Sequence, residues 1–173
     1  NFTDSAGQER IISTKKTVFN KPDGTKMLLG IMRDVTEYKR QQMALQESED
    51  RFQKMTANVP GMIYQFRLSV DGKISFTYIS PGSWQLYNLI PEEIEENANL
   101  IFATVPPADL SDLRRSMAIS VATLEPWQQQ WRHIMQNKVK WLQGSSRPEK
   151  QANGDIVWDG LMMDITELKQ TQQ

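Results

Sequence analysis

The chain has 173 residues, enough for one domain of ordinary size or two small ones. Its 20 lysines and arginines balance 21 aspartates and glutamates, so a net charge of −1 offers no broad positive field for nucleic acid. The absence of cysteine and the single histidine, His133, exclude disulfides, thiolate nucleophiles, cysteine-ligated clusters and multi-histidine metal sites. The longest apolar run, residues 27–32, is far shorter than the roughly 20 residues that span a bilayer.

Residues 10–19 and 25–34 are predicted to form a hairpin, because the Asp-Gly dipeptide at 23–24 favours a tight turn. Part of this segment recurs later in the chain. Residues 30–42 match residues 160–172 at an offset of 130, and seven of the thirteen positions are identical. The same offset aligns the Asp-Gly dipeptide with an Asn-Gly dipeptide, so the chain contains one and a fraction copies of a unit.

The next element, at residues 35–57, has the composition of a helix. Tyr38, Leu45, Phe52 and Val59 fall seven residues apart and form a weak apolar stripe. Such a stripe favours pairing with an identical helix. A helix that lies on its own domain has the same periodicity, and the sequence leaves both interpretations open.

The rest of the chain alternates between short strands and a helical block. The expected elements are strands at 63–68 and 74–80, helices within 81–124, strands at 127–136, 138–149 and 155–164, and then a helix start. No strand-helix-strand alternation is present. The order therefore predicts an α+β fold, an antiparallel sheet with helices on one face.

Both copies of the repeat end in the same strand-to-helix pattern. Asp34 and Glu37 are spaced as a capping box, and so are Asp164 and Glu167. We expect each Asp to accept hydrogen bonds from the first helical turn, while the Glu reaches back to the Asp amide. Each strand would then be joined to the next helix by a short and rigid connection.

Several short motifs occur together and in order. They are Glu-Ser-Glu-Asp-Arg-Phe at 47–52, Asn-Val-Pro-Gly-Met-Ile-Tyr at 58–64, Tyr-Ile-Ser-Pro-Gly at 78–82, Gly-x-Ser-Arg-Pro at 144–148, Val-Trp-Asp-Gly at 157–160, and Asp-Val-Thr and Asp-Ile-Thr at 34–36 and 164–166. Residues 47–173 thereby resemble the PAS domain with its PAC motif, as found in tandem arrays of bacterial sensor proteins. The resemblance implies a five-stranded antiparallel sheet with short helices on one face, flanked by linker helices.

The resemblance also implies a domain organisation. Residues 1–36 would be the C-terminal hairpin of a preceding, truncated PAS domain, and residues 37–57 a linker helix. Residues 58–166 would form a complete PAS domain with its PAC motif, and residues 167–173 would start the next linker helix. On this interpretation the chain is a segment of a longer array.

By resemblance, the chain is a regulatory sensor and dimerisation module of a multi-domain bacterial two-component protein. The parent would be a sensor histidine kinase, or a diguanylate cyclase, with its output domain outside this chain. We expect no catalytic residue here, a cytoplasmic location with any membrane anchor elsewhere in the parent, a homodimer through the linker helix or a sheet face, and no nucleic-acid partner. A redox or gas sensor that binds haem or flavin is the rival interpretation.

Five side chains are candidates to line a ligand cavity. They are Tyr78, Trp84, Phe102, Met117 and Trp131. An aromatic-lined cavity would take a small molecule, whereas the alternative is that tryptophans merely fill the core or cover a dimer surface. We expect no resident cofactor, and the identity of any ligand stays open.

His133 is the one residue that could ligate a haem iron. Strand alternation places it on the same face as Trp127 and Trp131, which is either the cavity or a packing surface. The alternative is an ordinary strand histidine bonded to a neighbour. The latter is favoured because the long helix, where haem-sensing relatives carry their ligand, has no histidine.

The remaining candidates concern the junction between sheet and helix. The predicted signal junction comprises Asp34, Thr36, Asp164, Thr166 and Glu167. We expect Asp164 to pair with Arg132 or Arg147, and Asp109 to cap the long helix through Arg115. The acidic run at residues 92–96 is interpreted as a solvated helix face, because consecutive carboxylates do not converge on one metal ion.

Overall fold

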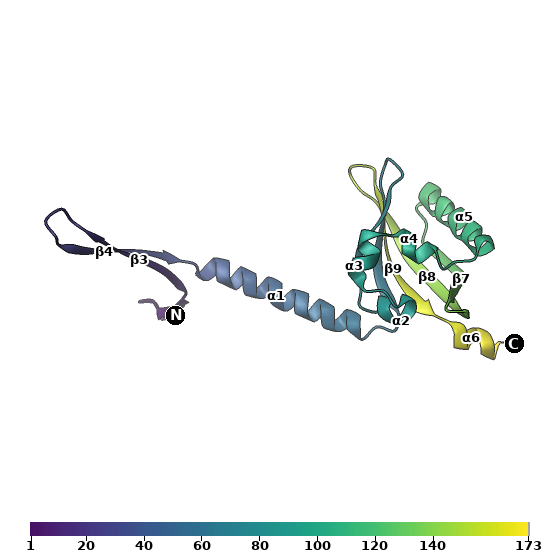
Figure 1. Ribbon diagram of the computed structural model, residues 1–173, viewed down its shortest axis with the longest axis horizontal. Coiled ribbons are helices and arrows are strands. Elements are labelled where there is room, and N and C mark those ends of the chain that lie inside the picture. Colours follow the sequence, from purple (N-terminus) through teal and green to yellow (C-terminus); the bar gives the residue numbers. More distant parts are fainter. Residues whose placement is uncertain (173) are drawn as a thin grey trace. The chain divides into compact units, whose positions relative to one another are not determined.

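The computed structural model describes residues 1–172, and Figure 1 traces their helices and strands in chain order. The chain divides into two compact units, Asn1–Phe52 and Gln53–Gln173. The boundary falls inside the 22-residue helix α1 (Thr36–Ala57). One continuous helix therefore ends the first unit and begins the second.

The first unit is a long hairpin that leads into α1. Its strands are β1 (Phe2–Thr3), β2 (Glu9–Arg10), β3 (Ile12–Asn20) and β4 (Lys26–Asp34), in two antiparallel pairs. Many apolar side chains of the β3–β4 pair are exposed, Leu28 to 62% and Met32 to 74%. The residues 130 positions later, Trp158 and Met162, are almost fully buried. The two copies of the repeat thus share a sequence pattern and differ in what covers it.

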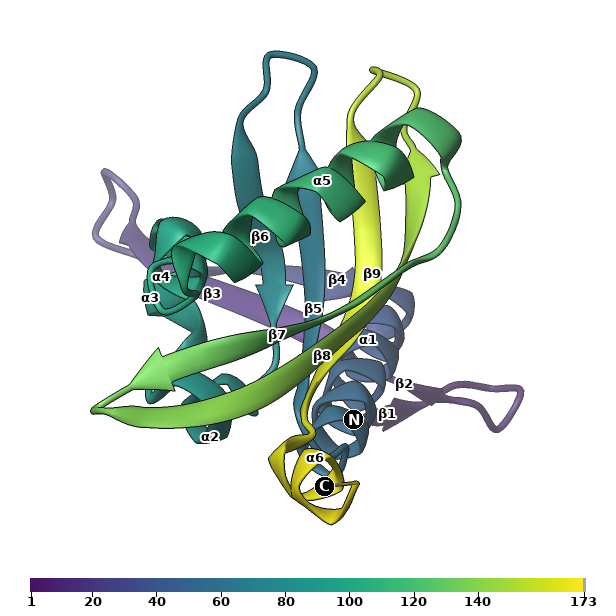
Figure 2. The same ribbon diagram turned by 90° about the vertical axis from the view of Figure 1, so that its right-hand side faces the viewer.

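The second unit contains one sheet with strand order β6-β5-β9-β8-β7, antiparallel throughout. Its strands are β5 (Met62–Leu68), β6 (Ile74–Ile79), β7 (Trp127–Met135), β8 (Lys138–Lys150) and β9 (Ile156–Asp164). Its helices are α2 (Ser83–Tyr87), α3 (Pro91–Glu96), α4 (Asn99–Phe102), α5 (Pro107–Thr123) and α6 (Thr166–Thr171). Figure 2 shows α5 crossing one face of this sheet. The expected fold class is confirmed.

Prolines and left-handed residues set the ends of the helices. Pro91 and Pro107 occupy the first positions of α3 and α5, where the missing N–H leaves no hydrogen bond unmade. Asn88 and Leu124 end α2 and α5 with φ angles of 54° and 55°. The left-handed backbone of each stops the helix, while its amide still bonds to the carbonyl four residues earlier.

The core lies between the sheet and helices α2 to α5. Alternate residues of β7 point inward, with Trp131 and His133 buried while Gln128 and Gln130 are exposed. The parity expected from the sequence is confirmed. Among the described residues, no helix combines the length and the apolar character needed to cross a bilayer.

Gly30 and Gly160 occupy matching positions of the repeat, and substituting them tests how tightly each copy is packed. A Cβ on Gly160 would lie 2.6–2.7 Å from atoms of Tyr64, Ser145 and Ser146, whereas one on Gly30 would meet only the Lys16 side chain at 3.9 Å. We expect Gly160→Ala to lower the free energy of unfolding by about 1–3 kcal/mol through overpacking. Urea denaturation checks this, with Gly30→Ala as the matched control. Equal stability of the two variants would contradict the packing argument.

Candidate functional site

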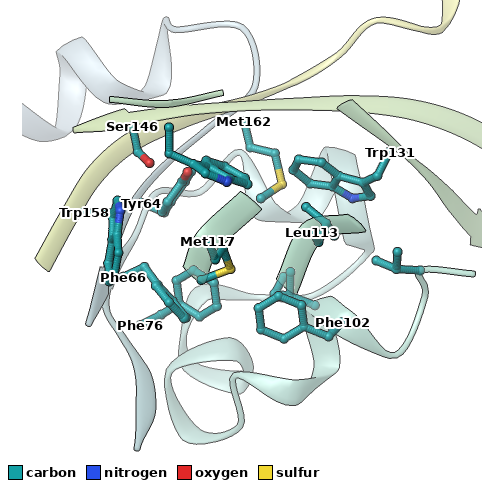
Figure 3. Close-up of a pocket in the computed structure, with 13 residues that line it drawn as sticks. Tyr64, Phe66, Phe76, Phe102, Leu113, Met117, Trp131, Ser146, Trp158 and Met162 are labelled. Atoms are coloured by element: carbon teal, nitrogen blue, oxygen red, sulfur yellow. The ribbon is translucent and has the colours of Figure 1, made fainter. Parts of the chain in front are cut away.

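A cavity of about 40 Å³ lies in the core between the sheet and helices α4 and α5 (Figure 3). A single buried water needs roughly 10–15 Å³ of such volume, so this cavity has room for only a few atoms. Neither a haem nor a flavin fits within these walls. Almost all of the lining is apolar, with Tyr64 and Ser146 as the hydroxyl-bearing exceptions.

The structure places three of the five predicted cavity residues on this wall: Phe102, Met117 and Trp131. Trp84 is 57% exposed, so its assignment to the cavity is wrong. Tyr78 does not line the cavity either, although it is half-buried. Both residues were chosen because they are aromatic. Aromatic character alone does not distinguish the inner face of β6 and α2 from the outer one.

Most of the cavity wall was not singled out in the sequence. The further lining residues include Tyr64, Phe66 and Phe76 on β5 and β6, Trp127 on β7, and Trp158 and Met162 on β9. On each strand these residues alternate with outward-facing ones, and that alternation is the sequence pattern that could have identified them. Choosing the correct face required knowing that β5 and β9 lie side by side at the centre of the sheet.

The polar groups on the cavity wall are neutral near pH 7, and two of their atoms, Trp131 Nε1 and Ser146 Oγ, are buried without a hydrogen-bond partner in the described part of the chain. Burial raises the pKa of Tyr64 to about 12, an effect that the neighbouring Ser146 hydroxyl partly offsets. Trp127 and Trp158 donate their indole N–H groups to Ser116 and Ser120 of α5, at 2.8 and 3.0 Å. These bonds attach α5 to β7 and β9. Among the described residues that line the cavity, none is a group with a pKa suited to acid–base chemistry near neutral pH.

His133 is fully buried but does not belong to the cavity wall. Its Nδ1 lies 2.7 Å from Thr104 Oγ1, and its ring meets Tyr87 edge-on with centroids 4.7 Å apart. Burial, aided by Lys140, holds the pKa of His133 below its usual value. The ring is therefore neutral at pH 7 and packed as a core residue, and it is not positioned to ligate a haem in the cavity.

Asp109 ties the start of α5 to β7 through Arg132. One carboxylate oxygen accepts from Arg132 N at 2.7 Å and Nε at 3.0 Å, and the other accepts from Nη2 at 2.7 Å. These bonds lower the pKa of Asp109. The predicted partner, Arg115, instead pairs with Asp112 on the surface, so that prediction is wrong. The interaction is long-range, which is why helical spacing did not reveal it.

The junction between β9 and α6 is built on Thr166. Its hydroxyl donates to Asp164 Oδ1 and accepts the amide of Trp141 on β8 at 2.9 Å. Asp164 Oδ1 also accepts the Thr166 amide at 2.9 Å. The amide of Ile165 bonds to the Trp141 carbonyl at 2.8 Å. The first residue of the helix is thus bonded to the neighbouring strand.

Two predicted details of this junction are wrong. Asp164 pairs with Lys140, at 3.4 Å, and with neither Arg132 nor Arg147, because Lys140 lies on the adjacent strand beside it. The capping box does not form as expected, since Asp164 bonds to Thr166 two residues later. In the described chain, Glu167 makes no side-chain hydrogen bond back to the Asp164 amide.

The same set of bonds occurs 130 residues earlier. The Thr36 hydroxyl donates to Asp34 and accepts the Ile11 amide at 2.8 Å, and the Val35 amide bonds to the Ile11 carbonyl at 2.9 Å. Arg10 takes the place of Lys140 beside the aspartate, at 3.7 Å. The sequence repeat is therefore also a repeat of hydrogen-bond geometry.

Helix α1 carries the predicted dimer stripe only in part. Tyr38, Leu45 and Phe52 are exposed to 60%, 62% and 50%. Val59 lies beyond the end of α1 at Ala57, so including it in the helical stripe is wrong. The turn at 58–61, which closes on a glycine with φ of +106°, ends the helix before that position.

The acidic run on α3 is exposed, as expected for a solvated face. One member, Glu93, accepts the Ile90 amide at 2.9 Å and caps the helix. Within residues 1–172 no group of three or more His, Asp or Glu side chains is arranged to hold a metal ion.

Asp109 and Asp112 provide a matched pair for a pH test. Asp109→Asn removes the charge-assisted bonds to Arg132, and we expect a loss of about 1–3 kcal/mol in the free energy of unfolding at pH 7. The folded-state pKa of Asp109 is lowered below 3.8. Its contribution is therefore present above about pH 4 and disappears as the pH falls through the folded-state pKa.

Denaturation of both variants across pH 2–7 measures this difference. Asp112→Asn, which breaks an exposed pair, should cost under about 1 kcal/mol at every pH. A pH-independent cost for Asp109→Asn would contradict an ionic role.

A comparison with solved structures finds a domain of the same fold and two weaker likenesses. A domain assigned to a light and redox sensing histidine kinase from Haloarcula marismortui matches with a TM-score of 0.51 and 16% identity, over 67% of this chain and 99% of that one. The N-terminal domain of a diguanylate cyclase with PAS/PAC sensor from Marinobacter aquaeolei matches at 0.48 and 14%, over 62% and 98%. A sensory box histidine kinase/response regulator from Burkholderia thailandensis matches at 0.49 and 14%, over 64% and 82%.

No protein-family model and no curated protein matches the chain. The fold is nonetheless defined by its own geometry: a five-stranded antiparallel sheet of order β6-β5-β9-β8-β7, with α2 to α5 inserted between β6 and β7. This topology, which the Haloarcula marismortui domain shares, is that of the PAS fold expected from the sequence motifs.

Proposed function

We propose that the chain is a regulatory sensor module that passes changes in its sheet to the helix that follows. The observation that carries this proposal is the Thr166 hydroxyl, which is bonded at once to Asp164 on β9 and to the Trp141 amide on β8. A shift between these two strands would change the first turn of α6. No catalytic role is assigned to any residue of this chain.

The repeat supports a serial arrangement of such modules. Residues 1–36 would be the last hairpin of a preceding copy, residues 37–57 the linker, residues 58–166 the complete copy, and residues 167–173 the start of the next linker. The Asp34, Thr36 and Ile11 bonds repeat those around Thr166. Helix α1 would then receive a signal by the same route through which α6 transmits one.

The output would lie in the parent chain, of sensor histidine kinase or diguanylate cyclase type, in a bacterial cytoplasm. A phosphorelay would be the downstream chemistry in the kinase case. The partner of the module would be a second copy of itself. This part of the proposal is supported by the exposed apolar stripe of Tyr38, Leu45 and Phe52 along one side of α1.

Thr166→Val tests the junction, since it keeps the shape of the side chain and removes its hydroxyl. We expect amide hydrogen exchange at Trp141 to accelerate about tenfold, the effect of losing one hydrogen bond to this half-buried amide. Exchange in α6 should also rise. Thr171→Val is the control, because that hydroxyl bonds only within α6. Unchanged protection at Trp141 in Thr166→Val would refute the coupling role.

Leu45→Glu tests the dimer, since a charge on the stripe disfavours helix pairing while the exposed position leaves the fold intact. We expect sedimentation of the full chain to show a dimer for wild type and a monomer for Leu45→Glu. Met43→Glu is the control, being 52% exposed on the same helix but off the stripe. A wild-type monomer, or equal behaviour of the two variants, would count against self-association through α1.

A further inference from the structure

A groove of about 420 Å³ shares part of its wall with the cavity of the second unit. Its walls come from β5, β6, α4 and α5, and three side chains, Phe66, Phe102 and Met117, line both spaces. A volume of about 300–1,000 Å³ is typical of sites that bind small molecules. The groove is of that size, whereas the cavity behind it is about 40 Å³.

The groove is apolar along most of its wall and carries one positive charge. Leu68, Ile74 and Val121 are among its apolar residues, and Asn99 and Arg114 are its polar ones. Within the part of the chain that the structure describes, Arg114 forms no ion pair. The next residue, Arg115, is paired with Asp112 at 3.4 Å. The groove thus presents an uncompensated guanidinium beside an apolar surface.

We propose that this groove binds an amphipathic carboxylate, a molecule with one anionic head group and an unbranched aliphatic chain. The carboxylate would lie at Arg114 and Asn99, because a guanidinium donates two parallel hydrogen bonds to one carboxylate. The aliphatic chain would lie along the apolar wall. This inference rests on the proposed sensor function, for which it names the class of ligand.

Met117 separates the groove from the core cavity, and its movement would transmit ligand binding from one to the other. It is half-buried on α5 and lies on the wall shared by the two spaces, and methionine side chains rearrange at low cost. Displacing it would bring the end of the aliphatic chain against the inner wall. Phe66 on that wall contacts Trp158 of β9 at a centroid distance of 5.8 Å. β9 runs on to Asp164, so an occupied groove would press on the strand that begins the α6 junction.

Calorimetric titration of the full chain at pH 7 with octanoate and with octylammonium tests the head-group chemistry. The two probes share a tail and differ in the sign of their charge. We expect saturable one-to-one binding of octanoate, and binding of octylammonium at least tenfold weaker. Arg114→Gln should weaken octanoate binding by about tenfold or more, because it removes the charge-assisted hydrogen bonds to the carboxylate. Arg115→Gln, one residue along α5, should leave it unchanged.

A second pair of variants tests the place of binding. Ala118 lies on the groove wall, and Ala118→Trp should abolish octanoate binding by filling the groove from its rim. Ile119 is 58% exposed and is not part of the wall, so Ile119→Trp should bind normally.

Absence of saturable octanoate binding, equal affinity for octylammonium, or equal affinities of Arg114→Gln and Arg115→Gln would overturn the inference. The expected hydrogen exchange at Trp141 does not depend on any of these outcomes. The exchange measurement therefore tests the junction separately, and failure of one proposal is distinguishable from failure of the other.

Discussion

The bond between the Thr166 hydroxyl and the Trp141 amide joins the sheet of this protein to the helix that leaves it. A strand can end and a helix begin without any such link, and the two would then move independently. Here the first residue of the helix, Thr166, is still hydrogen-bonded through its side chain to the backbone of the neighbouring strand β8. The Asp164 carboxylate holds that hydroxyl in place and is itself held by Lys140. Sheet geometry therefore sets the direction of the helix.

The same constraint explains why the two copies of the repeat can differ so strongly in burial. The pairing of the two hairpin strands and the bonds of the junction are present in both copies, so neither depends on a covering layer. Burial of the apolar side chains is a separate matter. Trp158 is covered by α5 and by Phe66, whereas Leu28 at the matching position is 62% exposed. Hydrogen bonding defines the shape of this motif, and packing decides how stable it is.

Much of the architecture was predictable, because it follows from local periodicity. The alternation in β7 placed Trp131 and His133 on one shared face, and the Asp-Gly and Asn-Gly turns located both long hairpins. Prediction of the site was weaker. Trp84 looked like a cavity residue by composition and lies on the surface. Tyr64 and Trp158 do line the cavity, and although both lie in motifs quoted for the resemblance, nothing in those motifs indicates that they face a cavity. Composition indicates that aromatic side chains are available, and only the pairing of β5 with β9 brings particular ones together.

The amino-acid sequence by itself determined the elements, the repeat of 130 residues and the absence of thiol and multi-histidine chemistry, since these depend on residue identity and on neighbours within a few positions. The tertiary structure decided the partners of the charged side chains. Asp109 meets Arg132 across 23 positions of sequence and Asp164 meets Lys140 across 24. It also decided the size of the cavity and, among the residues that the structure describes, left Arg114 without an ion pair beside an apolar groove. Such contacts depend on how strands and helices pack, and that packing is a property of the whole sheet rather than of any local pattern.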